Sequence, residues 1–380
     1  MDDQIPTSQI WSRENCHTKY KFQMKRAVLL TFLATIFATL LFITSSRLYG
    51  NYVVSMVPAE ASRAAWLEHL CPRYSRRSQS TAGLLKLAWE PLVDDAIFFL
   101  DTSCSRALSG RQACVVESSA YHHPHRPVRL LMTAPYINHT YPLLQVVLGL
   151  DNVRASWLDL DQVFREEPLL TWHRERQWML NEARAPTFVS DSGRIELLRL
   201  YGGTYLDLDL ITLRPMPSFS NWLGWHGPMQ INNAAMNFAK GHPLSQVLAS
   251  SIPKTFDPTR CCSIGPYMVH DAVQEMCPEK FTSSANISEE DVKCGDVTVF
   301  ARTRLYPFSP YNELDFVFLK KKGKALNFFA NQNETYFLHL YSSHTTKVRV
   351  PLGNETLLGE AAMRNCPKVY NAIVKHGMEL

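Results

Sequence analysis

The sequence lacks three features that would place it in other classes of protein. It has no internal repeat, no low-complexity tract, and no basic run interleaved with aromatic residues. The last absence, together with a formal net charge of only +4, argues against nucleic acid as a partner. No CxxC spacing occurs among the nine cysteines, which disfavours a zinc site.

A histidine cluster, His122, His123 and His125, also fails to make a convincing metal site. Pro124 and Pro127 disrupt any regular ligand geometry there. We therefore expect these three side chains to lie in a solvated loop.

From about Asp94 onward, apolar runs of strand length alternate with helix-like segments. The runs AIFFLDTS, VRLLMTA and VRASWLDL, which begin at residues 96, 128 and 153, are typical of buried strands. RQACVVESSAYHH and PLLQVVLGL, which begin at residues 111 and 142, are typical of helices. This alternation predicts an α/β fold whose mostly parallel sheet is covered by helices.

Residues 27–44, AVLLTFLATIFATLLFIT, are eighteen residues without a charge, at the lower limit for a membrane-spanning helix. Five basic residues precede the run and two follow within a similar distance, which predicts a cytosolic N-terminus. These are Arg13, Lys19, Lys21, Lys25 and Arg26 before it, and Arg47 and Arg63 after it. A signal peptide cleaved after Ser45-Ser46 is the alternative, but the long charged leader favours an uncleaved anchor.

We therefore predict a cytosolic tail (1–26), a transmembrane signal anchor (27–44), a polar stem (45–93) and a lumenal domain (94–380). Two counts agree with a lumenal domain. All four Asn-x-Ser/Thr sequons follow the anchor, as do eight of the nine cysteines, an even number that is typical of disulfides. The sequons begin at Asn138, Asn286, Asn333 and Asn354, and the cysteines are Cys71, Cys104, Cys114, Cys261, Cys262, Cys277, Cys294 and Cys366.

The stretch GGTYLDLDLITL, residues 202–213, places two carboxylates in one of the most apolar runs of the chain. The preceding segment predicts a helix that Ser190 caps and that ends at Gly202-Gly203. In the strand expected to follow, Asp207 and Asp209 point to the same side, where they repel each other unless a cation lies beside them.

A hard divalent ion such as Mn²⁺ or Mg²⁺ prefers oxygen ligands and can hold a diphosphate at the same time. Open parallel sheets bind ligands beyond the carboxyl ends of their strands. We therefore predict that Asp207 and Asp209 hold a metal diphosphate at the end of a buried strand. The alternative is an edge strand whose aspartates face water.

Residues 189–215, VSDSGRIELLRLYGGTYLDLDLITLRP, resemble the donor-site motif of the family 32 glycosyltransferases, in particular their alpha-1,4-galactosyltransferase and alpha-1,4-N-acetylglucosaminyltransferase branch. Further similar stretches extend the resemblance to roughly residues 95–375. They are IFFLDTSC, RQACVVESSA, INNAAMNFAKGHPL, SIGPYMV, YFLHLYSSHT and NCPKVYNAI.

The resemblance implies a single Rossmann-like nucleotide-sugar domain of the GT-A type in a Golgi type II membrane enzyme. It implies a retaining reaction with Mn²⁺ (or Mg²⁺) and a UDP-sugar, and an acceptor that is a glycolipid such as lactosylceramide or another glycan. Which UDP-sugar is the donor stays open, and a homo-oligomer is a further open alternative.

The resemblance also implies roles for individual residues. Asp209 would ligate the metal directly and Asp207 would contact the ribose or a metal-bound water, which makes both catalytic as well as metal-site residues. His339 would complete the metal shell, although in an apolar run it also fits a core residue. Asn233 is a further catalytic candidate, which would lie near the donor sugar; the alternative is a turn residue. The remaining donor-binding residues would be Asp191 and Arg194, which share one face of a helix, with Thr102 and Gly203.

The sequence departs from the family pattern at three places. Tyr341-Ser342 replaces Trp-Asn after the late histidine, Cys261-Cys262 stands before Gly265-Pro266, and the motif reads Asp-Leu-Asp rather than Asp-Thr-Asp. The first two departures bear on the choice of acceptor and on closure of the metal shell. Cys104 and Cys114 are similar to a family pair, which predicts a bridge between them.

Two other classes of function compete with the transferase. A phosphohydrolase of the haloacid-dehalogenase type also uses a DxD motif, but the Thr or Val that it has at the fourth position after the first Asp is here Ile211. A glycosylated, disulfide-bearing chain also fits that class poorly. A lumenal lectin-like protein that kept the fold and lost catalysis is the non-enzymatic alternative, against which the intact Asp191, Arg194, Asp207 and Asp209 argue.

Overall fold

The computed structural model describes residues 65–71, 81, 83–227, 230–281, 287–331 and 334–380, which belong to a compact unit, Ser62–Leu380. The predicted tail (1–26), the predicted anchor (27–44) and the sequons at Asn286 and Asn333 lie outside the described residues. Within the described part of the chain, no helix is both long and apolar enough to span a membrane.

The compact unit includes residues that the sequence assigned to the stem. Helix α2 (Ala65–Leu70) packs on the domain through Trp66, which is 2% exposed and stacks on Trp157 with ring centroids 5.7 Å apart. Cys71, directly after the helix, forms a disulfide with Cys104. Part of the segment that the sequence assigned to the stem is therefore packed on the domain.

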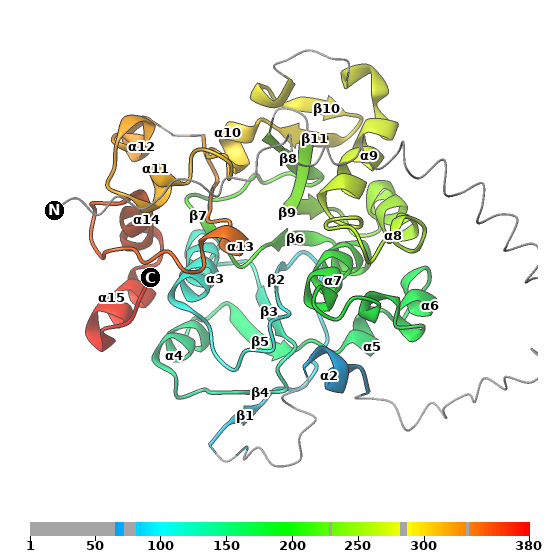
Figure 1. Cartoon of the computed structure of the whole chain (residues 1–380), viewed down its shortest axis with the longest axis horizontal. Helices are drawn as coiled ribbons and strands as arrows, with labels where there is room; N and C mark the ends of the chain where they lie inside the picture. The colour runs from blue at the N-terminus through cyan, green and yellow to red at the C-terminus, as the bar shows by residue number, and fades with distance from the viewer. Residues whose placement is uncertain (1–64, 72–80, 82, 228–229, 282–286, 332–333) are drawn as a thin grey trace, which may run out of the picture. The chain divides into compact units, whose positions relative to one another are not determined.

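The main sheet of the described residues has eight strands in the order β10-β11-β8-β9-β6-β2-β3-β5 (Figure 1). In that order they are β10 (Val292–Cys294), β11 (Val297–Phe300), β8 (Trp222–Gly227), β9 (Gln230–Phe238), β6 (Gly203–Leu206), β2 (Ile97–Asp101), β3 (Val128–Met132) and β5 (Val153–Trp157). Two small pairs accompany it: β1 (Leu85–Lys86) with β4 (Tyr136–Ile137), and β7 (Leu210–Thr212) with β12 (Phe337–His339).

The sheet is mixed rather than mostly parallel. Strands β6, β2, β3 and β5 are parallel neighbours, whereas β9 is antiparallel to both β6 and β8. Only residues 228–229 separate β8 from β9, too few for the crossover that a parallel pair needs. The predicted α/β class is confirmed. The antiparallel strand pairs were not predicted, because apolar runs do not indicate strand direction.

The predicted elements of the first half are all present: β2, β3 and β5, with α3 (Gly110–His122) and α4 (Pro142–Leu148) between them. Strand β2 is buried on both faces because its side chains alternate between two apolar layers. Phe99 packs with the layer that contains α3 and α4, and Phe98 with the layer that contains α7.

The remaining helices cover the sheet and build the second half of the unit (Figure 1). They are α5 (Leu160–Val163), α6 (Leu169–Arg174), α7 (Ala185–Tyr201), α8 (Pro243–Thr255), α9 (Pro266–Met276), α10 (Arg302–Leu305), α11 (Asp315–Phe318), α12 (Phe328–Asn331), α13 (Ser342–Thr345), α14 (Leu357–Asn365) and α15 (Pro367–His376). Short 3₁₀ turns are η2 (Gln177–Met179), η3 (Pro278–Lys280), η4 (Ile287–Glu289) and η5 (Gly323–Ala325).

Helix α7 ends as predicted but begins earlier. Gly202 and Gly203 follow it with φ of 65° and 90°, and a Cβ on Gly203 would lie 2.4 Å from the carbonyl oxygen of Ala96, so glycine is required. The prediction that Ser190 caps the helix is wrong, because α7 begins at Ala185 with a proline in its first turn. The Ser190 hydroxyl instead accepts a hydrogen bond from Arg194.

Three disulfides occur among the described residues: Cys71–Cys104, Cys114–Cys366 and Cys277–Cys294. The predicted bridge between Cys104 and Cys114 is therefore wrong. Cys114 lies on the buried face of α3, against which the C-terminal helices α14 and α15 pack, so its partner comes from the end of the chain. Cys261 and Cys262 form no disulfide in the structure, and their Sγ atoms lie 2.6 Å apart.

We expect a peptide map of the unreduced protein to contain the Cys114–Cys366 cross-link and no Cys104–Cys114 cross-link. Replacing Cys114 and Cys366 by serine should lower the free energy of unfolding by about 2–5 kcal/mol, because the bridge closes a long loop of the unfolded chain. Urea unfolding measures the change. A Cys104–Cys114 peptide, or a double variant as stable as the unmodified chain, would contradict the assignment.

His123 is not solvated, contrary to prediction. It follows α3, is 9% exposed, and its Nδ1 lies 2.9 Å from the carbonyl oxygen of Ser119. Its Nε2 accepts a hydrogen bond from the Met216 amide at 2.8 Å, which places the ring proton on Nδ1. Burial lowers the pKa of His123 from 6.5 to about 4. His125 is exposed, as predicted.

Because the pKa of His123 is lowered by folding, only the unfolded chain binds this proton between pH 6.5 and pH 4. We expect His123 to remove about 2 kcal/mol of stability as the pH falls through that window, after allowance for solvent screening. Urea unfolding at several pH values should give a shallower pH dependence for His123→Gln than for the unmodified chain. The exposed control His125→Gln should keep the full dependence, and equal slopes for both variants would contradict the assignment.

Candidate metal and nucleotide-sugar site

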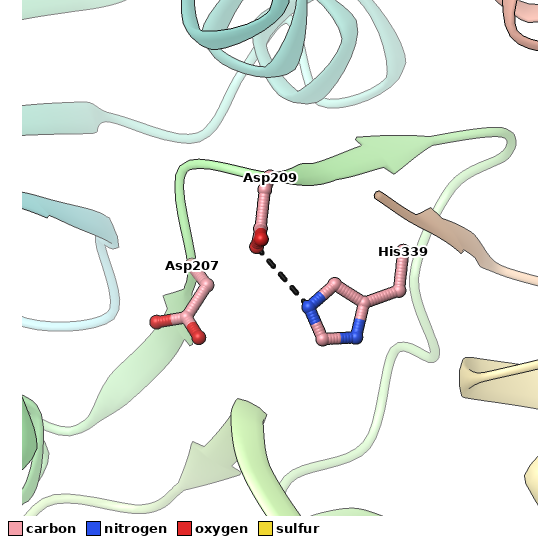
Figure 2. A group of neighbouring side chains, drawn as sticks. All are labelled: Asp207, Asp209 and His339. Atoms are coloured by element: carbon pink, nitrogen blue, oxygen red, sulfur yellow. Dashed lines mark ion pairs between the residues drawn. The ribbon is translucent and has the colours of Figure 1, made fainter. Parts of the chain in front are cut away.

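Asp207 and Asp209 lie in a turn rather than in a continuous strand. Strand β6 ends at Leu206, and β7 begins at Leu210 and leaves the main sheet to pair with β12. His339, the last residue of β12, is paired with Leu210 and so comes next to the turn. One ligand atom from each of Asp207, Asp209 and His339 lies within 4.8 Å of the others (Figure 2). The two aspartates therefore lie at the end of a buried strand, as predicted. The strand itself stops before the motif instead of continuing through it.

Asp209 is held from two sides. Its Oδ2 accepts a hydrogen bond from the Ser342 amide at 2.8 Å, and its carbonyl oxygen accepts one from the Leu340 amide. Its Oδ1 lies 3.2 Å from Nε2 of His339 (Figure 2). This contact is an ion pair when the imidazole is protonated, and Oδ1 accepts no other hydrogen bond among the described residues. The carboxylate is therefore oriented but retains a free acceptor.

Asp207 is tied to the protein through one oxygen. Oδ1 accepts a hydrogen bond from the Tyr205 hydroxyl at 2.7 Å and lies 3.1 Å from Nη1 of Arg194. The side chain keeps 27% of its surface exposed. Tyr205 and Arg194 thus fix the rotamer of Asp207 while part of its carboxylate remains accessible.

Arg194 is the buried cation behind the two aspartates. Its Nη1 donates to the carbonyl oxygen of Asn233 at 3.0 Å, and its Nη2 lies 3.3 Å from Oδ1 of Asp191. The guanidinium also lies over the ring of Tyr205, 4.6 Å from its centroid. Asn233, in strand β9 and 2% exposed, donates to the same Asp191 oxygen at 2.9 Å. Asp191, Arg194, Asn233 and Asp207 therefore form one buried polar network.

The two aspartates have pKa values displaced in opposite directions. Burial raises the pKa of Asp207, and the charge of Asp209 adds to that rise, which Arg194 opposes. Burial would also raise the pKa of Asp209, but the attraction of His339 and the amide of Ser342 outweigh it, so this pKa lies below its ordinary value. The pKa of Arg194 lies above its ordinary value because Asp207, Tyr205 and Asp191 outweigh the effect of burial. Arg194 therefore stays charged.

A cavity of about 830 Å³ opens beside the carboxylates. Its walls come from the carboxyl end of β2, the start of α3, the first turns of α7, the turn that carries the two aspartates, and the C-terminal part of the chain. The residues from these walls are Thr102, Ser103, Ser109, Gly110, Arg111, Gln112, Pro186, Thr187, Ser190, Arg194, Asp207, Leu208, Asp209, Ser342, Thr346, Lys347, Val348, Arg349, Glu379 and Leu380.

Most, but not all, of the predicted site residues meet at this cavity. Thr102, Arg194, Asp207 and Asp209 line it. Asp191 and Asn233 stand behind Arg194, and His339 stands behind Asp209. The interpretation of Asn233 as a turn residue is excluded by its place in β9. Gly203 lies at the other end of β6 from Asp207, against Ala96, and does not line the cavity.

The sequence alone did not point to the start of α3 or to residues 346–349 as walls of the cavity. Ser109 caps α3 in a reciprocal capping box with Gln112, a signal that could have been read from the S-x-x-Q spacing. Arg111 donates to the carbonyl oxygens of Thr345 and Val348, which joins α3 to the segment that carries Lys347. No local signal in the sequence links these two stretches, because they are more than 200 residues apart.

An aromatic cluster adjoins His339. The rings of His339 and Tyr341 have centroids 3.8 Å apart, and those of His339 and Tyr306 are 5.5 Å apart. His226, near the end of β8, contacts both tyrosine rings, and burial lowers its pKa to about 4. The Nε2 atom of His226 is buried and has no hydrogen-bond partner among the described residues.

The side chains at the turn fit a divalent metal ion. Two carboxylates and an imidazole are ligands that Mn²⁺ accepts, and their atoms lie close enough to share one ion. Oδ1 of Asp209 is buried without a hydrogen-bond partner among the described residues, a costly state that an ion shared with Nε2 of His339 would relieve. The two aspartates do not simply face water from an edge strand, because the side chain of Asp207 is 27% and that of Asp209 16% exposed.

Two protein-family models match the chain. The model described as glycosyltransferase sugar-binding region containing DXD motif matches residues 109–228. The model described as alpha 1,4-glycosyltransferase conserved region matches residues 237–373. The resemblance predicted from the sequence is thereby confirmed.

The chain is also similar to individual glycosyltransferases. Human alpha-1,4-N-acetylglucosaminyltransferase is 26% identical over 292 residues, which cover 73% of this chain and 81% of that protein. Rat lactosylceramide 4-alpha-galactosyltransferase is 26% identical over 284 residues, which cover 74% of this chain and 76% of that protein. Among solved structures, mouse xyloside xylosyltransferase 1 in its apo form is 11% identical, with a TM-score of 0.37 over 67% of this chain and 99% of that chain.

We expect Arg194→Met to lower the free energy of unfolding by about 3–5 kcal/mol, because it leaves Asp191 and Asp207 without their buried cation. Urea unfolding measures the loss. The control is Arg364→Met, which removes an exposed arginine paired with Glu360 on one helix and should cost less than about 1 kcal/mol. Equal losses for the two variants would show that the buried network does not stabilise the fold.

Proposed function

We propose that this chain, a relative of the alpha-1,4-glycosyltransferases, is a retaining alpha-1,4-glycosyltransferase that uses a UDP-sugar. It would move galactose or an N-acetylhexosamine to a terminal galactose or N-acetylhexosamine of a glycosphingolipid such as lactosylceramide, or of another glycan. The observation that carries the proposal is the pair Asp207 and Asp209 at the end of the central strand, facing a cavity of nucleotide-sugar size. The two matched family models, both of glycosyltransferases, support it.

The metal ion would be held by Asp209, Asp207 and His339, and we propose Mn²⁺ with Mg²⁺ as the alternative. When bound, such an ion supplies Lewis-acid neutralisation of the negative charge that develops on the departing diphosphate. The protein prepares this site in advance. The Ser342 amide holds Asp209, while Tyr205 and Arg194 hold Asp207, so neither carboxylate has to reorient when substrate arrives.

The donor would lie along the cavity. Thr102 stands at the carboxyl end of β2, where open α/β sheets bind nucleotides. The N-terminus of α3 and the side chain of Lys347 add positive potential, which favours a diphosphate, whereas Arg349 is paired with Glu379. Asp191 contacts Arg194 and Asn233 rather than the cavity, so we assign it a positioning role in which it orients Arg194 toward the donor.

We further propose that the enzyme is a Golgi type II membrane protein whose residues 27–44 cross the membrane and whose catalytic domain is lumenal. The three disulfides of the described residues are typical of an oxidising compartment. Asn354, one of the two described sequon asparagines, is exposed, as a glycan acceptor must be.

A donor screen tests the proposal. The full-length chain in detergent is offered UDP-glucose, UDP-galactose, UDP-N-acetylgalactosamine or UDP-N-acetylglucosamine, with Mn²⁺ and lactosylceramide. We expect one donor to support transfer with an alpha-1,4 linkage and retained anomeric configuration. Asp209→Asn should lower the rate at least about 100-fold, because it weakens the metal site. Asp151→Asn, a change at an exposed aspartate outside the cavity, should leave it unchanged.

Other outcomes separate the alternatives. Mn²⁺-dependent UDP binding without transfer or donor hydrolysis would favour the lectin-like protein. Hydrolysis of phosphate esters in the absence of any nucleotide sugar would favour the phosphohydrolase. Absence of UDP binding in a folded protein would contradict the nucleotide-sugar site itself.

A further inference from the structure

Among the described residues, two neighbouring cysteines, Cys261 and Cys262, belong to none of the three disulfides. They lie between α8 and α9, outside the cavity described above, with Cys261 exposed and Cys262 half-buried. Their Sγ atoms are 2.6 Å apart. Neighbouring side chains of an extended chain point to opposite sides, so a turn of the backbone is needed to bring these two sulfurs together.

That turn, residues 257–265, has an unfavourable backbone conformation at Cys262, whose φ is 66°. A residue with a Cβ seldom adopts this left-handed conformation unless the surrounding contacts maintain it. The carbonyl oxygen of Cys262 accepts a hydrogen bond from the Gly265 amide at 3.1 Å, and the Ser263 hydroxyl donates to the carbonyl oxygen of Asp257 at 3.1 Å. The turn therefore holds the two thiols side by side.

Two thiols held in this way are placed to form a disulfide. A sulfur–sulfur bond is about 2.05 Å long, so a movement of about half an ångström would join the two Sγ atoms. The sequence predicted disulfides from the eight cysteines that follow residue 44, and closure here would pair the last two of them. Cα atoms joined by a trans peptide lie about 3.8 Å apart, closer than in ordinary disulfides. A bridge between neighbours is therefore strained, and strained, exposed bridges are the ones that exchange readily with other thiols.

The two thiols have different parts in such an exchange. Burial raises the pKa of the Cys262 thiol, and the adjacent Cys261 thiol and Asp191 raise it further, so the exposed Cys261 is the first nucleophile. As its thiolate, Cys261 attacks one sulfur of glutathione disulfide and releases one glutathione. Cys262 then loses its proton to solvent and attacks Sγ of Cys261, which forms the bridge and releases the second glutathione. Two electrons pass to glutathione disulfide, and the two protons lost by the cysteines balance those gained by the two glutathione thiols.

The same turn touches the polar network of the donor site. A Cβ on Gly265 would lie 2.9 Å from Oδ2 of Asp191, so the backbone of the turn packs directly on that carboxylate. Oδ1 of Asp191 lies 3.3 Å from Nη2 of Arg194, which in turn contacts Asp207. A displacement of Gly265 would therefore be felt by the cation that orients the metal motif.

The beginning of the turn is anchored beside the start of α7. Nδ2 of Asn181 donates to the carbonyl oxygen of Pro258 at 2.9 Å, and Nη1 of Arg184 donates to that of Thr259 at 3.3 Å. Arg184 directly precedes α7, whose first turns line the cavity. Both ends of the turn therefore contact elements that build the donor site.

We propose that Cys261 and Cys262 form a redox-active pair that closes to a disulfide, and that closure fixes the turn against Asp191 and thereby tightens donor binding. The effect on the donor rests on the proposed function, whereas the disulfide does not. With the pair open, the backbone at Cys262 is free to relax toward a more favourable conformation, which moves Gly265 away from Asp191. The closed ring removes that freedom, so less conformational entropy is lost when the donor binds.

Differential alkylation of the full-length chain in detergent tests the disulfide. The chain is equilibrated in glutathione buffers of increasing reducing power, free thiols are blocked with N-ethylmaleimide, and bridged thiols are then reduced and labelled with deuterated N-ethylmaleimide. Cleavage after Arg260 gives a peptide that contains Cys261, Cys262 and also Cys277, which is bridged to Cys294. We expect the neighbouring pair to change from the second label to the first in buffers where Cys277 keeps the second label, so Cys277 is an internal control.

Three outcomes would overturn the redox-active pair. The first is a pair that stays open in the most oxidising buffer. The second is glutathione bound to Cys261 or Cys262 in place of a bridge, which the mass of the unreduced peptide reveals. The third is a pair that opens only where the Cys277–Cys294 bridge also opens.

Calorimetry and hydrogen exchange test the effect of closure. With the other bridges closed in both states, the oxidised chain should bind UDP and Mn²⁺ about fivefold more tightly than the reduced chain, as expected for ordering roughly one residue of backbone. The amides of Gly265 and Val269, which both donate within this region, should exchange about fivefold more slowly in the oxidised chain. The double variant Cys261→Ser/Cys262→Ser should respond to neither buffer.

The two readouts separate this inference from the proposed function. Equal exchange rates in the oxidised and reduced chains would overturn the fixing of the turn, with or without UDP binding. Slower exchange with an unchanged affinity for UDP would overturn the link through Asp191. Slower exchange in a chain that binds no UDP in either state would support the fixing of the turn and contradict the nucleotide-sugar site instead.

Discussion

The site depends on one buried cation. Arg194 lies on α7, contacts Asp191 one turn away on the same helix, reaches Asp207 after β6, and donates to the backbone of β9. Three elements are therefore joined through one guanidinium. Two carboxylates in an apolar setting need such a partner, because each would otherwise be protonated or would destabilise the fold. The rigid spacing of the guanidinium donors lets one side chain serve both carboxylates and a carbonyl oxygen.

Around that cation, the chain brings together stretches that are far apart in the sequence. The main sheet supplies Asp207, the short pairing of β7 with β12 supplies His339, and Ser342 follows directly to hold Asp209. Arg111 then joins the beginning of α3 to the segment after β12. The wall of the cavity is thus built from both ends of the folded unit, and the Cys114–Cys366 bridge holds those same two ends together.

Local sequence patterns predicted helices and strands correctly where burial and backbone geometry both favour the same element. Strand β2 is apolar on both faces because both of its faces are covered, and α7 ends at two glycines whose backbone no other residue adopts without strain. The predictions were wrong where contacts with residues far away in the sequence set the environment of a side chain. Ser190 is a good capping residue, yet it lies inside α7, where its hydroxyl contacts Arg194. His123 is flanked by polar and proline residues, yet it is buried against the backbone of Met216.

Periodicity and residue spacing act over one or two turns of chain. They were therefore enough to predict the order of strands and helices in the first half of the fold and to single out Asp191, Arg194, Asp207 and Asp209. Long-range packing instead set the separation of β6 from β7 at the motif, the pairing of Cys114 with Cys366, and the hydrogen bond from Tyr341 to the backbone of Phe308. Each of these depends on contacts between residues far apart in the chain, and no local pattern records which distant surface a residue will meet.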